Sequence, residues 1–371
     1  MTRLVEFIKQ KIKQFYIRKL PVPGSAPPVN ITKILCSPRT ILIIPYNRMG
    51  TILLATRVFK SIRERYPDAR ISIAVHTAWS VLIQNDPTID EVITFGDEID
   101  NPHSVGFKAI GETLANRAFD IAFFLSYQYD LPTAYLARLS NASLRISFKT
   151  DQEYEFFNVQ IVPSHGIRYE VERYLEMLGA LGIGGEIRDY TMTISPAIRE
   201  KARLKFFSGG METRKDSVAG FDLTREISGD PISRKNAEAV IAALAAELGL
   251  TVIVFFEPGK RAIAASLKET FGKKIMLLED RPVSTAAGLL SFCSFVIAHN
   301  TDLFQLAIAL KIPVIGILTK NDMIQWSPGA SERIAHLERS ILSWPSSALI
   351  AQTAKHYLKN RRQSDLKEDR T

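Results

Sequence analysis

The sequence of 371 residues has little cysteine and no long apolar run. Its only two cysteines, Cys36 and Cys293, each lie in an apolar context, which predicts buried reduced thiols and a reducing compartment, with no disulfide framework and no metal site. The N-terminus lacks the apolar core of a secretion signal. The longest uncharged stretch, between Arg281 and Asp302, contains Pro282, several Ser and Thr residues and His299. It therefore predicts a helix and a buried strand rather than a membrane span.

The net charge of +8 belongs to the two ends of the chain. Residues 1–20 hold six basic residues and one acid, and residues 355–371 hold six basic and three acidic residues, so residues 21–354 sum to zero. A neutral body gives no reason to expect nucleic acid as a partner.

Residues 2–20 have apolar side chains at helical spacing, flanked by lysines. This pattern is typical of a basic amphipathic helix, which either lies on an anionic membrane surface or docks on its own protein. The segment "LPVPGSAPP" (20–28) would end any helix and predicts a linker.

The body alternates apolar strands and helices, which predicts parallel sheets covered on both faces. In the first half, strands are expected at 41–46, 71–76, 91–95, 120–126 and 144–148, with helices at 48–66, 104–117 and 131–139. A long helix is expected at 169–183. In the second half, strands are expected at 217–223, 251–256, 274–279, 295–299 and 313–319, with helices at 233–248, 260–271, 284–292 and 302–310.

This alternation predicts an α/β protein with two doubly wound, Rossmann-like domains that face a central cleft, where ligands bind at the carboxyl ends of strands. The expected parts are a basic extension and linker (1–38), an N-terminal domain (39–165), a helix and interdomain linker (166–195), a C-terminal domain (196–330), and C-terminal helices with a basic tail (331–371).

Three segments resemble glycosyltransferase family 9, the bacterial ADP-heptose:lipopolysaccharide heptosyltransferases. They are "ILIIPYNRMGTILLATRVFKSIRERYPDARISIAV" (41–75), "NDPTIDEVITF" (85–95) and "VIAHNTDLFQLAIALKIPVIGILTKNDMIQWSP" (296–328). Their order and spacing are similar to that family over roughly residues 40–330. The resemblance implies the GT-B fold, an acceptor-side first domain, a second domain for the nucleotide sugar, an ADP-heptose-like donor, a glycolipid or glycan acceptor, and no cofactor.

The resemblance also implies how transfer works. An inverting transfer needs a base for the acceptor hydroxyl, and hydrogen-bond donors or cations for the charge that grows on the departing diphosphate. In the family, the Asp of an "MGD" turn is the base, and a Lys and the start of a "DTG" helix hold the phosphates. A helix N-terminus suits that task because its N–H groups and dipole favour anions.

This sequence departs from the family pattern at several of those positions. Thr51 stands at the Asp of "MGD", Asn300-Thr301-Asp302 replaces "DTG", Gln305 replaces a His, and Ser228 falls near the expected Lys. Threonine is no general base at neutral pH, although Thr51 can position an acceptor by hydrogen bonding.

The catalytic carboxylate is therefore expected from Asp302 or Asp130, which both follow predicted strands. Asp302 either contacts sugar hydroxyls or is an ordinary first-turn acid, and Asp130 is either a base or a helix N-cap. The donor-binding candidates are Arg48, Gly50, Thr224, Arg225, Asn300, Thr301 and Gln305. Arg234 and Lys235 are further possible cations.

Three other side chains have two interpretations each. His76 and His299 end predicted strands and are either site residues or hydrogen-bonded structural histidines. Trp326 either packs a loop or stacks on a sugar or adenine.

Two hypotheses for the function remain open. One is a glycosyltransferase on the cytoplasmic membrane face that adds a sugar such as heptose to a lipopolysaccharide-type or other cell-surface glycan. The other is a catalytically impaired member that binds sugar nucleotides or serves in assembly.

Overall fold

The computed structural model describes residues 30–101, 103–127, 130–150, 156–187, 189, 192–208, 218–224, 232–279, 282–340 and 343–368, with side chains through Lys359. The predicted helix over 2–20, the linker over 20–28, Arg225 and Ser228 lie outside these residues, and the basic tail is described only in part.

The described chain divides into two units. The first takes in the chain up to His165 together with 171–188, and the second takes in 166–170 and the chain from Asp189 onward. Most of helix α6 (Glu170–Ala180) thus belongs to the first unit, and its residues Val171, Tyr174 and Met177 are fully buried.

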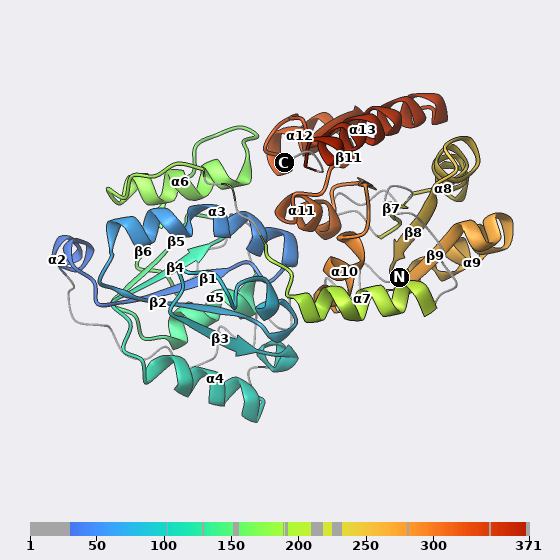
Figure 1. Ribbon diagram of the computed structural model, residues 1–371. Coiled ribbons are helices and arrows are strands. Elements are labelled where there is room, and N and C mark those ends of the chain that lie inside the picture. Colours follow the sequence, from blue (N-terminus) through green and yellow to red (C-terminus); the bar gives the residue numbers. More distant parts are fainter. Residues whose placement is uncertain are drawn as a thin grey trace. The chain divides into compact units, whose positions relative to one another are not determined.

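The first unit is built on a six-stranded parallel sheet of order β3-β2-β1-β4-β5-β6 (Figure 1). Its strands are β1 (Thr40–Pro45), β2 (Arg70–His76), β3 (Glu91–Phe95), β4 (Ile121–Leu125), β5 (Leu144–Phe148) and β6 (Val159–Ile161). Its other helices are α2 (Ile31–Cys36), α3 (Met49–Arg65), α4 (Val105–Ala115) and α5 (Leu131–Leu139), with short 3-10 helices η1 (Thr77–Leu82) and η2 (Asp97–Asp100).

Alternation along β1 explains why its residues from Ile41 to Ile44 are all apolar. Leu42 and Ile44 point into a cluster that also contains Phe107 of α4 and Leu131 of α5. Ile41 and Ile43 must point to the other face, because successive side chains of a strand alternate, and they are fully buried too. A strand covered on both faces is the reason for the continuous apolar run.

The second unit repeats the topology of the first, with sheet order β12-β11-β10-β7-β8-β9 and all pairs parallel. Its strands are β7 (Val218–Asp222), β8 (Thr251–Phe256), β9 (Ile275–Glu279), β10 (Phe295–Ala298), β11 (Val314–Leu318) and β12 (Ile334–Glu338). Its helices are α7 (Pro196–Ser208), α8 (Arg234–Ile241), α9 (Arg261–Phe271), α10 (Val283–Leu290), α11 (Asp302–Ala309), α12 (Lys320–Trp326) and α13 (Ser347–Glu368). A π-helical turn, η4 (Ala242–Glu247), continues α8, and 3-10 turns η5 (Pro258–Lys260) and η6 (Gly272–Lys274) flank α9.

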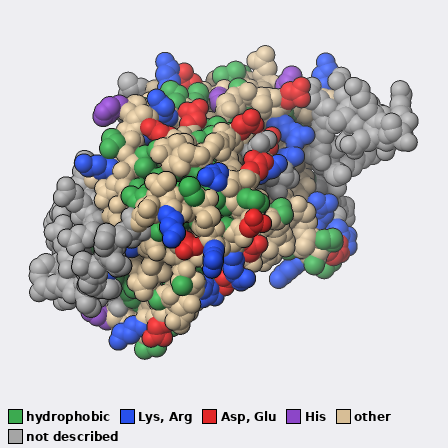
Figure 2. All heavy atoms as spheres, turned by 90° about the vertical axis from the view of Figure 1, so that its left-hand side faces the viewer, with side chains coloured by type: hydrophobic (Ala, Val, Ile, Leu, Met, Phe, Trp, Pro, Cys, Tyr) green, Lys and Arg blue, Asp and Glu red, His purple; other side chains and the backbone are tan. Residues whose placement is uncertain are grey.

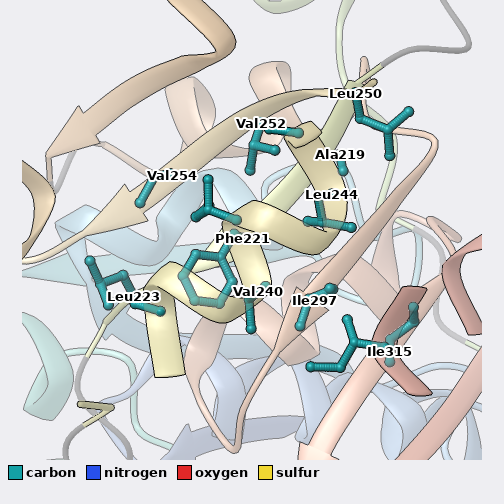
Figure 3. Close-up of a cluster of buried hydrophobic side chains, with 14 of the residues drawn as sticks. Ala219, Phe221, Leu223, Val240, Leu244, Leu250, Val252, Val254, Ile297 and Ile315 are labelled. Carbon is teal, nitrogen blue, oxygen red and sulfur yellow. The ribbon is translucent and has the colours of Figure 1, made fainter. Parts of the chain in front are cut away.

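One face of the second sheet packs into the largest described apolar cluster (Figure 3). Phe221 of β7 lies among Val240 of α8, Val254 of β8 and Ile297 of β10. The last helix, α13, joins the same cluster through Ile350, Ala354 and Tyr357. This helix is therefore held by the second unit's own core.

Five helices and strands were not predicted, and two predictions were wrong in part. The sequence reading missed α2, α7, α12, β6 and β12. C-terminal helices with a basic tail were expected over 331–371, and α13 is such a helix, but Ile334–Glu338 is strand β12, which pairs with β11. As an edge strand, β12 buries only alternate positions such as Ile334 and Leu337, so it lacks the apolar run of a central strand. Cys293 is buried as expected, but Cys36 is exposed because α2 buries no residue.

No helix in the described part of the chain is long and apolar enough to cross a membrane. On the face of the first unit in Figure 2, basic and acidic side chains are interspersed. This agrees with the neutral body expected from the sequence.

Candidate active site

Each unit has one place where the strand order reverses. In the first unit β1 and β4 are neighbours, with Pro45 opposite Leu125. In the second unit β7 and β10 are neighbours, with Phe221 opposite Ile297. Ligands of doubly wound sheets bind at the carboxyl ends of such strands. We call these places the first and second switch points.

At the first switch point, Thr51 fastens the turn between β1 and α3. Its hydroxyl lies 3.0 Å from the Tyr46 carbonyl oxygen and 2.8 Å from that of Arg48, and the side chain is 6% exposed. The single hydroxyl proton is therefore directed at backbone oxygens within the turn. This geometry gives Thr51 a structural role in holding the turn closed.

Arg48 occupies the N-cap position of α3 without making a side-chain cap. Its guanidinium makes no hydrogen bond or ion pair with any residue that the structure describes. Gly50 is buried in the first helical turn, where the helix dipole favours negative charge. Both candidates thus lie at a position suited to an anionic group.

Asp130 follows β4 at the same edge of the sheet and caps helix α5. Its Oδ2 accepts hydrogen bonds from the backbone N–H of Thr133 at 3.3 Å and from the Thr133 hydroxyl. Burial raises the pKa of Tyr46 and the Asp130 carboxylate raises it further, so the two side chains lie within electrostatic range of one another. A carboxylate has about four acceptor positions, so capping and a second role are compatible.

At the second switch point, Asp222 links the ends of β7 and β10. This fully buried carboxylate accepts hydrogen bonds from the Thr224 backbone N–H at 2.9 Å and hydroxyl at 2.6 Å, and from the Thr301 hydroxyl. Burial raises the pKa of Asp222, and the nearby Asp302 carboxylate raises it further. The candidates Thr224 and Thr301 are therefore held together by a residue that the sequence reading missed.

Two other candidates fasten α11 to the segment around α12. The Asn300 amide donates to Asp322 Oδ1 at 2.7 Å, and the Gln305 amide donates to the Trp326 carbonyl oxygen at 2.6 Å. Both side chains are almost fully buried, at 2% and 5% exposure. Their amide donors are thus engaged inside the protein, and they support the α11 N-terminus rather than point out from it.

Asp302 is the first residue of α11 and is partly exposed. The helix is capped by Thr301, whose hydroxyl oxygen accepts from the Phe304 N–H at 3.4 Å. Phe304 in turn packs so closely on β11 that a Cβ at Gly316 would lie 2.9 Å from its ring. Glycine at 316 therefore sets how near α11 approaches the sheet.

Comparison with known proteins now identifies the family. Residues 107–343 match the family described as glycosyltransferase family 9 (heptosyltransferase), which is more than half of the chain. The chain belongs to glycosyltransferase family 9. A lipopolysaccharide heptosyltransferase 3 of Escherichia coli is 25% identical over 300 residues, covering 77% of this chain and 85% of that protein.

Solved structures show the same GT-B fold. The Escherichia coli ADP-heptose lps heptosyltransferase II is similar at a TM-score of 0.70 and 16% identity, covering 87% of this chain and 99% of that one. The Escherichia coli heptosyltransferase WaaC with ADP is similar at a TM-score of 0.64 and 17% identity, covering 86% of this chain and 99% of that one. The two Rossmann-like units expected from the sequence are thus confirmed, and the structure adds that both sheets have the same strand order.

The other candidates of this family 9 member have local structural contacts. His76 accepts from the Ala78 N–H at 3.1 Å through Nδ1, and its Nε2 lies 3.2 Å from Asp97. The Trp326 side chain is 5% exposed, which favours the packing interpretation. Arg234 pairs with Glu238 on the surface of α8. Within the described residues, no group of three or more His, Cys, Asp or Glu is arranged to hold a metal ion.

His299 is fully buried beside Phe221 and Trp344. Burial lowers its pKa to about 3, with Arg339 and Lys260 contributing and the nearby Ile317 backbone opposing them. His299 is therefore neutral at neutral pH and belongs to the core of the second unit. A proton-donating role at the active site does not fit this environment.

Acid should destabilise the protein through His299. The unfolded histidine has a pKa near 6.5, so as pH falls below that value the unfolded state binds a proton that the folded state excludes until about pH 3. At pH 5 this lowers the free energy of unfolding by about 2 kcal/mol relative to pH 7. Urea unfolding at both pH values should show that the free energy of unfolding changes less with pH in His299→Gln than in the wild type. The exposed control His103→Gln should show the same change with pH as the wild type. If His299→Gln also shows the wild-type change, the role assigned to His299 is wrong.

Proposed function

We propose that this protein transfers heptose from an ADP-heptose-like donor to a saccharide of lipopolysaccharide. The observation that carries the proposal is the family match over residues 107–343, together with a relative described as a lipopolysaccharide heptosyltransferase 3. Further support comes from the similar structures, an ADP-heptose lps heptosyltransferase II and the heptosyltransferase WaaC with ADP.

In this proposal the second unit binds the donor. The diphosphate lies at the N-terminus of α11, where backbone N–H groups and the helix dipole favour anions. Thr224 and Thr301 would line this position, and Asn300 and Gln305 hold it in shape through Asp322 and Trp326. Asp302 would contact hydroxyl groups of the sugar rather than the phosphates, because two negative charges repel.

The first unit binds the acceptor and supplies the base. Asp130 takes the proton of the attacking hydroxyl, since Thr51 cannot and its hydroxyl is directed at backbone oxygens. Arg48 would stabilise negative charge at the start of α3. In this proposal the base and the diphosphate site thus come from different units of the chain.

A nucleotide-release assay tests the proposal. The purified protein should release ADP from ADP-heptose only when a heptose-deficient lipopolysaccharide is present, and mass spectrometry should show one added heptose on the acceptor. ADP binding without any transfer to such acceptors would instead support a catalytically impaired sugar-nucleotide binder. Thr51 at the family's Asp position is the observation that favours this second function.

We also propose that the protein attaches peripherally to the inner face of the cytoplasmic membrane through its basic ends. Each Lys or Arg near an anionic surface contributes about 1 kcal/mol, and salt screens the attraction. The full chain should sediment with vesicles that contain anionic lipid, and it should be released by high salt.

A chain shortened to residues 30–359 is the control for membrane attachment. It keeps Asn30, which caps α2, and Tyr357, which packs in the core of the second unit. It should fold and stay in the supernatant. Equal sedimentation of the full and the shortened chain would rule this proposal out.

A further inference from the structure

Tyr46 is the residue that directly follows β1 at the first switch point. Because Pro45 lies opposite Leu125, Tyr46 leaves the sheet beside the segment that leads to Asp130. Its carbonyl oxygen accepts from the Arg48 N–H at 2.7 Å and from the Thr51 hydroxyl at 3.0 Å. The backbone of Tyr46 is thus fixed by the same turn that carries Arg48.

The Tyr46 side chain is half-buried, and its hydroxyl makes no hydrogen bond to any residue that the structure describes. Tyr66, at the other end of α3, differs in this respect, because its hydroxyl donates to the Leu35 carbonyl oxygen at 3.0 Å. Within the described chain, the Tyr46 phenol is therefore a donor and acceptor that the fold itself does not use.

The charged groups around Tyr46 favour its neutral form. Partial burial and the Asp130 carboxylate raise the pKa of the phenol, and Arg48 opposes them. A neutral phenol can donate one hydrogen bond and accept others. Beside a carboxylate and a guanidinium, such a group suits a ligand rich in hydroxyl groups.

We propose that Tyr46 contacts the acceptor saccharide and donates a hydrogen bond to a hydroxyl next to the one that attacks. This inference rests on the proposed function. The attacking hydroxyl gives its proton to Asp130, its oxygen bonds to the anomeric carbon, and the bond from that carbon to the diphosphate oxygen breaks. The electron pair of that bond leaves with ADP. Tyr46 holds the acceptor ring so that the attacking oxygen faces Asp130.

Tyr46→Phe removes only the hydroxyl and tests this role. We expect the KM for a de-O-acylated, heptose-deficient lipopolysaccharide to rise about three- to tenfold, as for the loss of one neutral hydrogen bond. The KM for ADP-heptose and the thermal midpoint should stay unchanged. Tyr66→Phe is the matched control, since it should lower the thermal midpoint and leave both KM values unchanged.

Binding of the same acceptor, measured by calorimetry without donor, separates this inference from the proposed function. If the wild type binds the acceptor but transfers nothing, the function fails, and a three- to tenfold weaker Kd of Tyr46→Phe would still support the contact. Equal acceptor Kd and KM for wild type and Tyr46→Phe would overturn it. A change in the KM for ADP-heptose alone, or the absence of any acceptor binding, would overturn it as well.

Discussion

Asp130→Asn should lower the kcat of heptose transfer by about 10²–10⁴-fold, the usual effect of losing a general base. The substitution separates the two roles of this residue, because asparagine caps helices about as well as aspartate. Helix α5 should therefore keep its start at Leu131, and the thermal midpoint should change little. ADP affinity, measured by calorimetry, should stay as in the wild type because Asp130 lies on the first unit.

Asp302→Asn is the matched control at the second switch point. Asp302 lies near the buried Asp222 and raises the pKa of that carboxyl. Removing its charge should relieve repulsion, so ADP should bind as tightly or more tightly, while kcat falls far less than in Asp130→Asn. If instead kcat falls more in Asp302→Asn than in Asp130→Asn, Asp302 is the base and the proposed assignment of the base to the first unit is wrong.

Thr51→Asp places the aspartate of the family's "MGD" turn at position 51, but we expect that this residue will not act as a general base. In Thr51→Asp, a carboxylate would replace a hydroxyl that lies within 3.0 Å of two carbonyl oxygens, and these oxygens repel negative charge. We expect lower stability and no gain in rate. Thr51→Ala should cost little activity, because only the fastening of the turn is lost.

The sequence predicted the central strands well, because their burial on both faces produces continuous apolar runs. Ile41–Ile44 and Thr251–Phe256 are examples, and each is a strand within a residue or two of the expected bounds. The missed strands, β6 and β12, are edge strands, with a neighbour on one side only and few buried positions. Helix α7 lacks strong amphipathic spacing, so periodicity could not reveal it.

The sequence predicted where the candidate residues lie in the two sheets, but not which residues they contact. Strand ends and helix starts placed Asp130, Thr301 and Asp302 at carboxyl edges, since local pattern decides where elements end. The partners of Asn300 and Gln305 lie more than twenty residues away, at Asp322 and Trp326, and no local pattern encodes such pairs.

The sequence did contain one signal for Asp222. It ends a strand, "VAGFD", whose other residues are all apolar or glycine. A carboxylate in a strand covered on both faces is costly unless it is hydrogen-bonded, so its presence indicates partners nearby. Thr224, two residues on, is one of them.

Asp222→Ala should destabilise the second unit and weaken ADP binding together. The substitution leaves the Thr224 N–H and the Thr224 and Thr301 hydroxyls without their acceptor, and each buried orphan costs about 1–3 kcal/mol. We expect the free energy of unfolding in urea to fall by about 2–5 kcal/mol. ADP affinity should fall about tenfold, because the ends of β7 and β10 must then be ordered by the ligand.

Asp222→Asn distinguishes the charge from the hydrogen bonds. Asparagine can still accept from Thr224, while its amide donates to Thr301, so most contacts survive without a buried charge. Because burial raises the pKa of Asp222 above its unfolded value, wild-type stability falls as pH rises from the unfolded pKa through the folded pKa. The stability of Asp222→Asn relative to wild type should therefore increase with pH.

Asp120→Ala is the control for Asp222→Ala. Asp120 accepts hydrogen bonds from the Arg39 and Thr40 N–H groups at the amino edge of the first sheet, so its loss should lower stability without changing ADP affinity. An Asp222→Ala protein that loses stability but binds ADP normally would show that this carboxylate supports the fold without shaping the donor site.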